Sequence, residues 1–545
     1  MKLKLSWITP NQRMVLVVSL FIMLTGNYTF LKRVAEIYFL DPGHLAFMVS
    51  VFFLFAAATA FLMNFLAYRG LTAPVLAIFL LISSATAYFT DKYGTVLNDE
   101  MLINMLQTNV SEAGDLLSVS LVIRLLVFGV IPAVLLVRYR PNSMGPVAEI
   151  RGMLFSGLLL ILFMVLCIAP FTSTYASFFR EHKSVRFYAN PTYVTYSAVN
   201  LAGRIFKDQG SQKISAVATD AKPTEVLESE EPRELIVLVV GETARADRFS
   251  LNGYARETNP NLQKEELISL KNVTSCGTST AVSVPCMFSD LTETHFSLEK
   301  VAKLENALDV LQRNGVEVLW RDNNSDSKGV ALRVAYENFR TPEKNPICDE
   351  ECRDVGMLKG LEDYIDQRAG KDILIVLHQM GNHGPAYYKR YPKEFEHFTP
   401  VCKTNELANC TREEIDNAYD NAVRYTDYFL SQVITLLKKY DGSHETAMLY
   451  VSDHGESLGE YGMYLHGAPK AFAPEAQTHV ASVVWFGSNF DYKLADLLPY
   501  EKDHLTHDAL FCTLLMAYEL DTPTCSESRK TIQAQHNSSI VIGRQ

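Results

Sequence analysis

The sequence predicts two unlike parts: five membrane-spanning helices, followed by an α/β domain built on a mostly parallel sheet. Apolar residues make up 48% of the 545-residue chain and charged residues only 20%. Residues 1–173 hold 11 of the 50 basic and 8 of the 61 acidic residues, which leaves a net charge of −14 on the rest. This acidic remainder offers no basic surface for nucleic acid. From residue 233 onward, short apolar strands alternate with helical patterns, as in α/β domains.

Five apolar runs are long enough for transmembrane helices, because about 20 residues cross a bilayer. The runs are 14–31, 45–67, 72–90, 119–137 and 153–172. Basic residues favour one side of them, namely Lys2, Lys4, Arg13, Arg69, Arg138, Arg140 and Arg151, against Lys32, Arg33 and Lys92 on the other. The positive-inside rule then places the N-terminus in the cytoplasm. We therefore expect a transmembrane domain over 1–173, with 91–118 as an outside loop.

The outside loop carries Asn104, Thr108 and Glu112 four residues apart, so they share one face of an expected helix. Spacing alone favours a solvated face over one turned toward an active site. Arg124, just inside the fourth span, is expected to snorkel outward, with a lipid phosphate as the alternative partner.

Residues 174–233 connect the two parts. The mixture of aromatic, basic and apolar residues over 178–206 predicts short helices on the membrane surface. Residues 207–233 have the composition of a linker. The soluble domain is expected to occupy 234–545.

Eight of the nine cysteines follow residue 270, and Cys167 alone lies in an apolar run. Near pairs occur at Cys276 and Cys286, Cys348 and Cys352, and Cys402 and Cys410, with Cys512 and Cys525 as a further candidate pair. No Cys-x-x-Cys spacing is present, which disfavours a structural zinc site and favours disulfides. Disulfides imply an oxidising compartment, in agreement with an outside soluble domain.

Buried strands are expected at 234–241, 315–320, 372–378, 447–452 and 482–487, and helices at 301–313 and 414–439. Ligands of such sheets gather at the carboxyl ends of the strands. Acidic and histidine residues follow several of these ends, namely Glu242, His383, Asp453, His454 and His466. Each has an ordinary structural explanation alone, but together they predict a site for zinc, which takes nitrogen and oxygen ligands.

The stretch SCGTSTAVSVPCMFSD (275–290) crowds Thr278, Ser279 and Thr280 at the start of an apolar run. A hydroxyl at a helix N-terminus suits either a nucleophile or a simple helix cap. Coordination to a metal would stabilise the ionised hydroxyl, so Thr280 is a candidate for both ligand and nucleophile. Asn324 and Lys328, in RDNNSDSKG, are candidates to contact a phosphate or to form a polar turn.

The chain resembles the lipid A phosphoethanolamine transferases, which include the mobile colistin-resistance enzymes. The resemblance covers nearly the whole chain, and five stretches carry it. They are VVGETARADRFSLNGY (239–254), SCGTSTAVSVPCMFS (275–289), WRDNNSDSKG (320–329), HQMGNHGPAYY (378–388) and SDHGESLGEYG (452–462). The spacing of Cys348 and Cys352 is narrower than the family leads us to expect. The resemblance implies a soluble fold similar to alkaline phosphatases and sulfatases.

The resemblance also implies roles for individual residues. Thr280 matches the nucleophile, and Glu242, Thr280, Asp453 and His454 match the ligands of one firmly bound zinc ion, with a second ion left open. His383 and His466 match histidines that bind substrate or a second zinc. Asn324 and Lys328 match phosphoethanolamine contacts. Asn104, Thr108 and Glu112 match a polar face that approaches the active site, which reverses the preference drawn from spacing.

The implied activity is transfer of phosphoethanolamine from phosphatidylethanolamine to a lipid A phosphate through a phospho-threonine intermediate. The implied location is the inner membrane of a Gram-negative bacterium, with the catalytic domain in the periplasm. Partners are expected to be membrane lipids, without nucleic acid, and a monomer is the expected state. The added ethanolamine cation would lower surface negative charge and confer polymyxin and colistin resistance.

Rival interpretations differ in chemistry. A sulfatase would need Cys or Ser in a C/S-x-P-x-R context, whereas Cys276 is followed by Gly277 and Thr278. A phosphoglycerol transferase, or a transferase for inner-core sugars or glucans, could use the same threonine and metal. An inactive scaffold or sensor would show an eroded ligand set, and here the set is complete.

Overall fold

The computed structural model describes the chain apart from residues 1–7, 39–41, 109, 208–213, 225–231 and 526–545. The chain divides into two compact units, Met1–Leu102 with Leu116–Gly203, and Ile103–Asp115 with Arg204–Gln545. Part of the predicted outside loop therefore packs with the C-terminal unit. Lys2, Lys4 and much of the predicted linker 207–233 lie outside the described residues.

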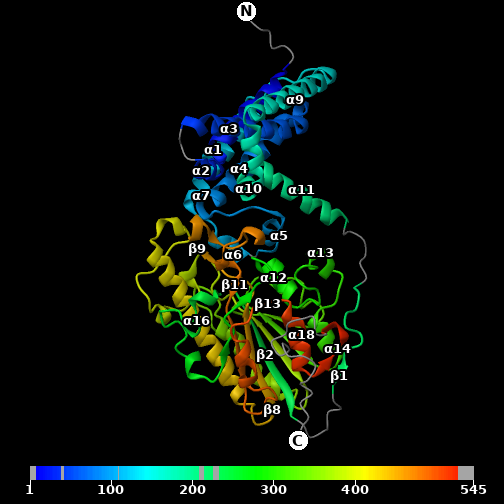
Figure 1. The fold of residues 1–545 in the computed structure, drawn as a ribbon, viewed down its shortest axis with the longest axis vertical. Coiled ribbons are helices and arrows are strands. Elements are labelled where there is room, and N and C mark those ends of the chain that lie inside the picture. The colour runs from blue at the N-terminus through cyan, green and yellow to red at the C-terminus, as the bar shows by residue number, and fades with distance from the viewer. Residues whose placement is uncertain (1–7, 39–41, 109, 208–213, 225–231, 526–545) are drawn as a thin grey trace, which may run out of the picture. The chain divides into compact units, whose positions relative to one another are not determined.

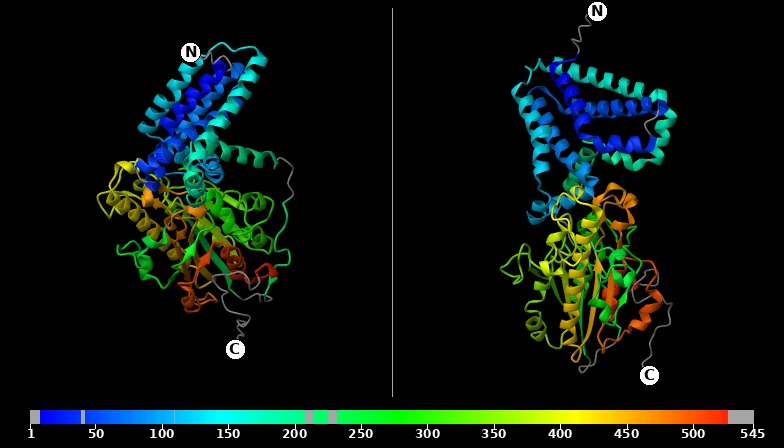
Figure 2. Two further views of the ribbon diagram at one scale, coloured as in Figure 1. Left: turned by 45° about the horizontal axis from the view of Figure 1, so that its top comes forward. Right: turned by 90° about the vertical axis from the view of Figure 1, so that its left-hand side faces the viewer.

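Helices build the N-terminal unit (Figures 1 and 2). They are α1 (Pro10–Gly26), α2 (Tyr28–Tyr38), α3 (Pro42–Leu66), α4 (Thr72–Tyr93), α7 (Val119–Arg124), α8 (Ile131–Arg138), α9 (Pro146–Ile168), α10 (Thr172–Glu181) and the larger part of α11 (Thr192–Lys207). A π-helical turn, Leu125–Val130, joins α7 to α8. Helix α3 packs against α1 and α9, and α4 packs against α8.

Four continuous helical stretches of the described chain are long and apolar enough to cross a membrane: His44–Leu66, Arg69–Tyr93, Val119–Arg138 and Pro146–Glu181. The pair α1 and α2, bent by 66°, makes a fifth when it is counted as one span. The predicted five-span topology is confirmed on that count.

The first predicted run, 14–31, is broken at Asn27 because the side chain of this residue bonds across the unit. Its amide nitrogen donates to the carbonyl oxygens of Ile22 and Asn190, at 3.2 and 2.7 Å. The backbone N–H of Asn190 returns a bond to the Asn27 side-chain oxygen at 2.9 Å. These side-chain hydrogen bonds offset the backbone hydrogen bonds that are lost where the helix is interrupted.

Arg124 does not simply snorkel as predicted. Its guanidinium bonds the Asp91 carboxylate at 2.6 Å and the Thr25 carbonyl oxygen at 3.1 Å. An ion pair within the unit thus satisfies this charge. The partner lies 33 residues away in sequence, beyond any local pattern.

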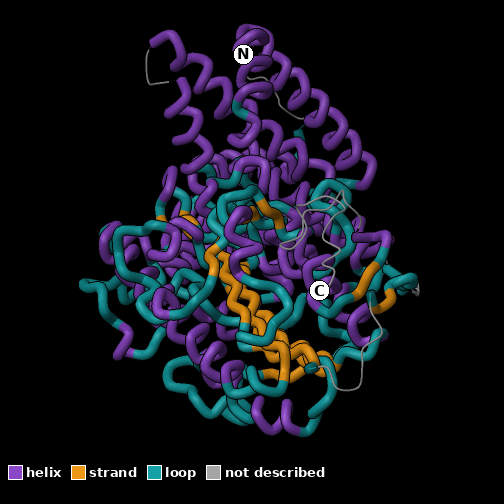
Figure 3. Tube along the Cα trace, turned by 60° about the horizontal axis from the view of Figure 1, so that its bottom comes forward, coloured by secondary structure: helices purple, strands orange, loops and turns teal. Residues whose placement is uncertain are grey.

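The C-terminal unit is built on a seven-stranded sheet with the order β3-β12-β8-β2-β7-β5-β6 (Figures 1 and 3). The strands are β2 (Arg233–Gly241), β3 (Ile268–Ser269), β5 (Glu317–Asp322), β6 (Ala335–Asn338), β7 (Ile373–His378), β8 (His444–Ser452) and β12 (Ser482–Phe486). The five from β8 to β6 run parallel, while β12 and β3 pair antiparallel at one edge. The predicted mostly parallel sheet is confirmed, and each predicted strand is present within three residues of its expected ends.

Both faces of the sheet are buried, which explains the unbroken apolar run of β2. Ile236, Leu238 and Val240 point into one core, together with side chains of α12, α14 and α18. Leu235 and Val237 point into the other, which α15 and α16 cover. These helices are α12 (Thr280–Met287), α14 (Ala307–Arg313), α15 (Leu361–Asp366), α16 (Arg412–Lys438) and α18 (Ala509–Ala517).

The helix predicted over 301–313 is interrupted. It forms α13 (Leu298–Val301) and α14, separated at Asn306, whose side chain caps Leu308 N–H while Asp309 caps the backbone N–H of Asn306. This capping box is a helix start signal that overrides the apolar periodicity. The remaining α-helices and strands of the described chain are shorter, and 3-10 turns lie between them. They are α5 (Asp99–Gln107), α6 (Val110–Asp115), α17 (Leu494–Leu497), β1 (Lys222–Pro223), β4 (Val273–Thr274), β9 (Ser457–Leu458), β10 (Tyr464–Leu465), β11 (His479–Val480), β13 (Leu505–Thr506) and β14 (Leu520–Asp521).

Four disulfides tie the C-terminal unit together: Cys276–Cys286, Cys348–Cys352, Cys402–Cys410 and Cys512–Cys525. Among the described cysteines only Cys167 is free. Each bridge closes a loop of 4 to 13 residues, so each constrains local structure rather than distant elements.

Candidate active site

Two neighbouring parallel strands bring three candidate ligands together. In the register of β2 and β8, Gly241 lies opposite Ser452. The residues that follow, Glu242 on one strand and Asp453 and His454 on the other, therefore leave the sheet side by side. Ligand atoms of these three residues all lie within 4.8 Å of one another, and all three side chains are fully buried.

The oxygens and nitrogen at this cluster are oriented as metal ligands would be. His454 Nδ1 donates to the Gly455 carbonyl at 2.9 Å, which leaves the lone pair of Nε2 facing inward. That Nε2 lies 3.4 Å from Glu242 Oε1 and 3.4 Å from Asp453 Oδ2. Both oxygens are buried without a hydrogen-bond partner. A lone pair and two carboxylate oxygens that face one another in a buried space form a set of donors that a bound cation would satisfy.

Electrostatics agree with this geometry. Burial, with the neighbouring Asp453 carboxylate, raises the pKa of Glu242 well above its ordinary value. A divalent ion with nitrogen and oxygen preference would stabilise the charged form of both acids, and zinc is such an ion. The residues present thus fit the zinc that the sequence predicts.

Thr280 is the first residue of α12, so it stands at the end of the helix where N–H groups lack partners. Its Oγ1 donates to Glu242 Oε2 at 3.1 Å and lies 3.3 Å from His454 Nε2. The Ser279 side chain makes no capping bond, and Thr280 itself points into the cluster. The structure therefore gives the Thr280 hydroxyl a place in the cluster rather than a place as a cap.

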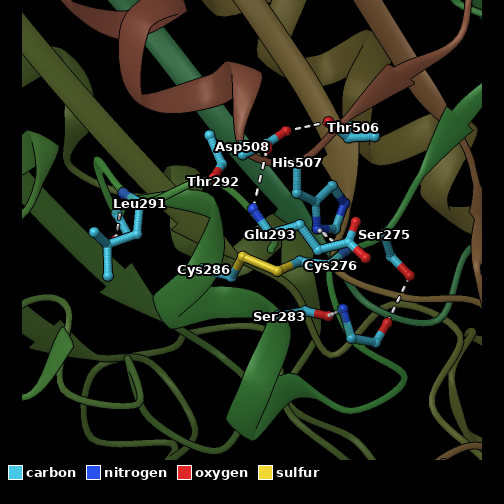
Figure 4. The surroundings of a disulfide bond; sticks show 12 residues. Ser275, Cys276, Ser283, Cys286, Leu291, Thr292, Glu293, Thr506, His507 and Asp508 are labelled. Carbon is cyan, nitrogen blue, oxygen red and sulfur yellow. Dashed lines mark hydrogen bonds between the residues drawn. A yellow bond between two sulfur atoms is a disulfide. The ribbon is translucent and has the colours of Figure 1, made fainter. Parts of the chain in front are cut away.

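The loop that carries Thr280 is fixed from several sides (Figure 4). The disulfide Cys276–Cys286 ties it to the end of α12, and Ser283 Oγ accepts from Gly277 N–H at 3.1 Å. The backbone N–H of Cys276 donates to His507 Nδ1 at 3.3 Å, and His507 Nε2 lies 3.0 Å from the Ser452 carbonyl. One buried histidine thus connects the loop that carries Thr280 to the strand end that precedes Asp453.

His507 gives a testable pH dependence. Burial lowers its pKa from 6.5 to about 4, so the folded protein keeps it neutral where the unfolded chain takes a proton. Stability is therefore expected to fall as pH drops from 6.5 to about 4, by about 3 kcal/mol from this residue alone. The His507→Gln variant should be less stable at pH 7 but lose less between pH 7 and pH 5 in thermal unfolding. The exposed His295→Gln serves as control, and equal acid slopes for His507→Gln and the unaltered protein would contradict the assignment.

Asn324 reaches the cluster from the β5 side. Its side-chain nitrogen donates to Glu242 Oε2 at 2.7 Å and to the Gln379 carbonyl at 2.6 Å. The preceding Asp322 fixes the turn by accepting from Asn324 N–H at 3.0 Å and Asp326 N–H at 3.1 Å. Asn324 thus orients a candidate ligand, in addition to any contact it makes with substrate.

Lys328 lies in the same turn, with a left-handed φ of 51°. Its ammonium donates to the Ser325 carbonyl at 2.8 Å. Burial lowers its pKa, while Glu112 is the first of several carboxylates that oppose this shift. The cation therefore lies among acids, where a phosphate group would be a further partner.

Two histidines and an acid extend the site. The ring centroids of His454 and His466 are 4.4 Å apart, and those of His466 and His383 are 5.2 Å apart. Glu456 Oε2 lies 2.9 Å from His466 Nδ1, and Tyr387 donates to Glu456 Oε1 at 2.9 Å. His454, Glu456 and His466 form a second group with metal-ligand spacing.

The two histidines differ in protonation. Burial and then His466 lower the pKa of His383 well below its ordinary value, so His383 is neutral. Burial also acts to lower the pKa of His466, but Glu456 outweighs it and the pKa is raised. His466 is therefore the better proton donor of the pair.

The segment 103–115 brings Glu112 to the site but not as part of the single helix predicted. Helix α5 ends at Gln107 and α6 begins at Val110, and Thr108 Oγ1 donates back to the Asn104 carbonyl at 2.8 Å. Glu112 is buried, and burial raises its pKa against the charges of Lys328, Arg390 and His466. Asn104 and Thr108 are half-buried, and among the described residues neither side chain forms a hydrogen bond to the cluster.

The sequence did not single out Glu456, His507, Asp322 or Gln379. Glu456 stands two residues after His454 in SDHGES, and that proximity was an available signal. His507 comes from a distant turn before α18 and could not be paired with Cys276 by spacing. Backbone contacts of this kind depend on the tertiary fold.

The chain is similar to known proteins over both of its parts. A family model described as "Sulfatase" matches residues 234–518, and one described as "Phosphoethanolamine transferase EptA/EptB" matches residues 54–205. The chain is 44% identical over 528 residues to phosphatidylethanolamine transferase Mcr-2 of Escherichia coli, covering 95% of this chain and 96% of the relative. It is 36% identical over 519 residues to phosphoethanolamine transferase EptA of Escherichia coli K12, covering 92% of each.

A solved structure extends the likeness to the whole chain. The integral membrane lipooligosaccharide phosphoethanolamine transferase A of Neisseria meningitidis superposes with a TM-score of 0.89 at 32% identity, covering 95% of this chain and 97% of that one. Fold and site thus define a membrane protein with a sulfatase-like domain. The chain belongs to the phosphoethanolamine transferase family. It is an integral membrane protein whose C-terminal domain is periplasmic.

Proposed function

We propose that this protein transfers phosphoethanolamine from phosphatidylethanolamine to a lipid A phosphate, with Thr280 as the nucleophile. The observation that carries the proposal is the position of Thr280 Oγ1, 3.1 Å from Glu242 and 3.3 Å from His454 at a helix N-terminus. The name of the Mcr-2 relative, a phosphatidylethanolamine transferase, supports the donor.

Glu242, Thr280, Asp453 and His454 would hold one zinc ion. When bound, zinc would supply positive charge that lowers the pKa of the Thr280 hydroxyl and favours the ionised nucleophile. Glu242 Oε2, which accepts the hydrogen bond of the Thr280 hydroxyl, would take the proton. The second group, with Glu456 and His466, is the candidate place for a second ion.

In the first half of the reaction, Thr280 Oγ forms a bond to the donor phosphorus as the bond to the glycerol oxygen breaks. His466 would give the leaving oxygen its proton: burial acts to lower its pKa, but the Glu456 carboxylate 2.9 Å from Nδ1 outweighs burial and raises the pKa, which favours the protonated imidazole. Lys328 would offset negative charge on the phosphoryl oxygens. Diacylglycerol leaves, and phosphoethanolamine remains on Thr280.

In the second half, an oxygen of the lipid A phosphate bonds to the phosphorus as the bond from phosphorus to Thr280 Oγ breaks. Glu242 would return the proton to the Thr280 oxygen, and His466 would regain its proton from the acceptor phosphate or from water. The product carries an added ethanolamine cation, which offsets negative charge on the outer surface. Cationic peptides such as polymyxin and colistin would then bind less strongly, and resistance would follow.

Peptide mass spectrometry tests the proposal directly. The zinc-loaded protein is incubated with phosphatidylethanolamine and without acceptor, then digested. We expect phosphoethanolamine on the peptide that contains Thr280, and loss of that label when lipid A is added. Release of diacylglycerol without labelling of Thr280 would replace the proposal with direct transfer or lipid hydrolysis.

A further inference from the structure

Arg390 is a buried guanidinium that connects three separate parts of the C-terminal unit. Its side chain is 1% exposed. One terminal nitrogen bonds Asp115 Oδ2 at 2.7 Å, the other pairs with Glu351, and Nε donates to the His383 carbonyl at 2.6 Å. Three groups distant in sequence thus meet on one side chain.

Asp115 is the last residue of α6 and is itself 6% exposed. Besides Arg390, its carboxylate accepts from Lys389 Nζ at 2.6 Å, and its carbonyl accepts from Asn405 at 2.7 Å. These bonds fasten the end of segment 103–115 to the loops around the site. Glu112 lies one turn earlier in α6.

Glu351 belongs to the small loop closed by the Cys348–Cys352 disulfide, and its side chain is 11% exposed. The narrow cysteine spacing thus shapes a loop that presents a carboxylate to Arg390. The Cys348–Cys352 disulfide, whose spacing is narrower than expected for the family, thus holds the loop whose Glu351 pairs with Arg390.

Burying a guanidinium costs several kcal/mol, and paired carboxylates regain this only with good geometry. Such a group contributes little to net stability but fixes the orientation of its partners, because the planar fork allows few arrangements. Of the partners of Arg390, Asp115 belongs to the same helix as Glu112. The His383 carbonyl belongs to the residue whose imidazole lies at the site.

We propose that Arg390 is a positioning residue that, held by Asp115 and Glu351, fixes Glu112 and His383 at the reaction site. The expected effects on KM and kcat rest on the proposed transfer activity. The expected immobilisation of segment 103–115 does not depend on that activity.

Two measurements on the full-length protein test the proposal. Hydrogen exchange is followed by mass spectrometry in peptides covering 103–115. The kinetics of transfer from phosphatidylethanolamine are followed in parallel, with KM and kcat separated. Arg390→Ala is compared with Arg390→Lys, with Asp115→Asn, and with the control Lys403→Ala, which breaks an exposed ion pair to Glu396.

For Arg390→Ala we expect faster exchange confined to 103–115 and the loop of His383. We also expect a KM for the donor about tenfold higher, equivalent to about 1.4 kcal/mol, and a kcat about 10²-fold lower. Arg390→Lys should recover part of the KM, because an ammonium still pairs with one carboxylate. Lys403→Ala should match the unaltered protein. Asp115→Asn, which keeps the shape of the side chain, should raise exchange in 103–115 even if Arg390→Ala folds poorly.

Unchanged exchange in 103–115 for both Arg390→Ala and Asp115→Asn would overturn the proposal, whatever the activity. A fall in kcat with unchanged KM and a uniform rise in exchange would also overturn it, since that pattern means general unfolding. If the unaltered protein forms no product, the proposed function fails, and the exchange result alone decides whether Arg390 holds the segment.

Discussion

Thr280→Ala is expected to abolish transfer, by at least about 10⁴-fold, because nucleophile removal in covalent enzymes costs this much or more. The expected loss includes the label on the Thr280 peptide and the release of diacylglycerol. Zinc content and the thermal unfolding midpoint should change little, since Glu242, Asp453 and His454 remain. Product is measured by mass spectrometry of lipid A from cells that express each variant.

Thr280→Ser is the matched control for this experiment. It keeps the hydroxyl at the start of α12 and should retain measurable transfer and labelling, now on serine. If Thr280→Ala instead retained full transfer, the covalent mechanism would be excluded and Thr280 would be left as a ligand or a structural residue.

Removal of the metal is the second change with a large expected effect. A chelator should stop transfer, and added zinc should restore it. The chelated protein should also unfold at a lower temperature, because a ligand that binds only the folded state stabilises it. This second readout does not depend on activity.

Asp453→Asn tests the same site from the protein side. The loss of one charged ligand should lower zinc content and make the unfolding midpoint insensitive to the chelator. Glu445→Gln is the control, because it removes a carboxylate from the opposite end of the same strand β8. Full zinc content in Asp453→Asn, or an equal loss in Glu445→Gln, would argue against the assigned ligands.

The sheet was predictable because its strands are buried on both faces and therefore appear as short, unbroken apolar runs. The candidate ligands were predictable for a related reason, since parallel strands end at one edge and Glu242 and Asp453 follow two such ends directly. Neither inference needed knowledge of which strands are neighbours.

Other features depended on contacts that sequence spacing does not encode. The apolar periodicity over 301–313 hid the cap at Asn306, and the four-residue spacing from Asn104 to Glu112 hid the break after α5. Sequence spacing offers only water or lipid as partners of Arg124, because its actual partner, Asp91, lies on another helix. Among the described residues the His507 ring bonds only backbone groups, and Arg390 pairs with carboxylates 39 and 275 residues away, so neither contact follows from sequence spacing.

The candidate ligands are far apart in the sequence, so the site can form only late in the synthesis of the chain. Glu242 directly follows β2, whereas Asp453 and His454 come some 210 residues later, directly after β8, the strand that pairs with β2. Strand β8 fills the central place beside β2, so the sheet stays open until most of the periplasmic chain has been exported. A chain arrested before residue 444 would lack β8 and would present Glu242 without its partners and an exposed apolar edge of β2, which are features of species that aggregate or are degraded. Quality control by periplasmic proteases is therefore expected to act on incomplete chains, and the finished site to escape it.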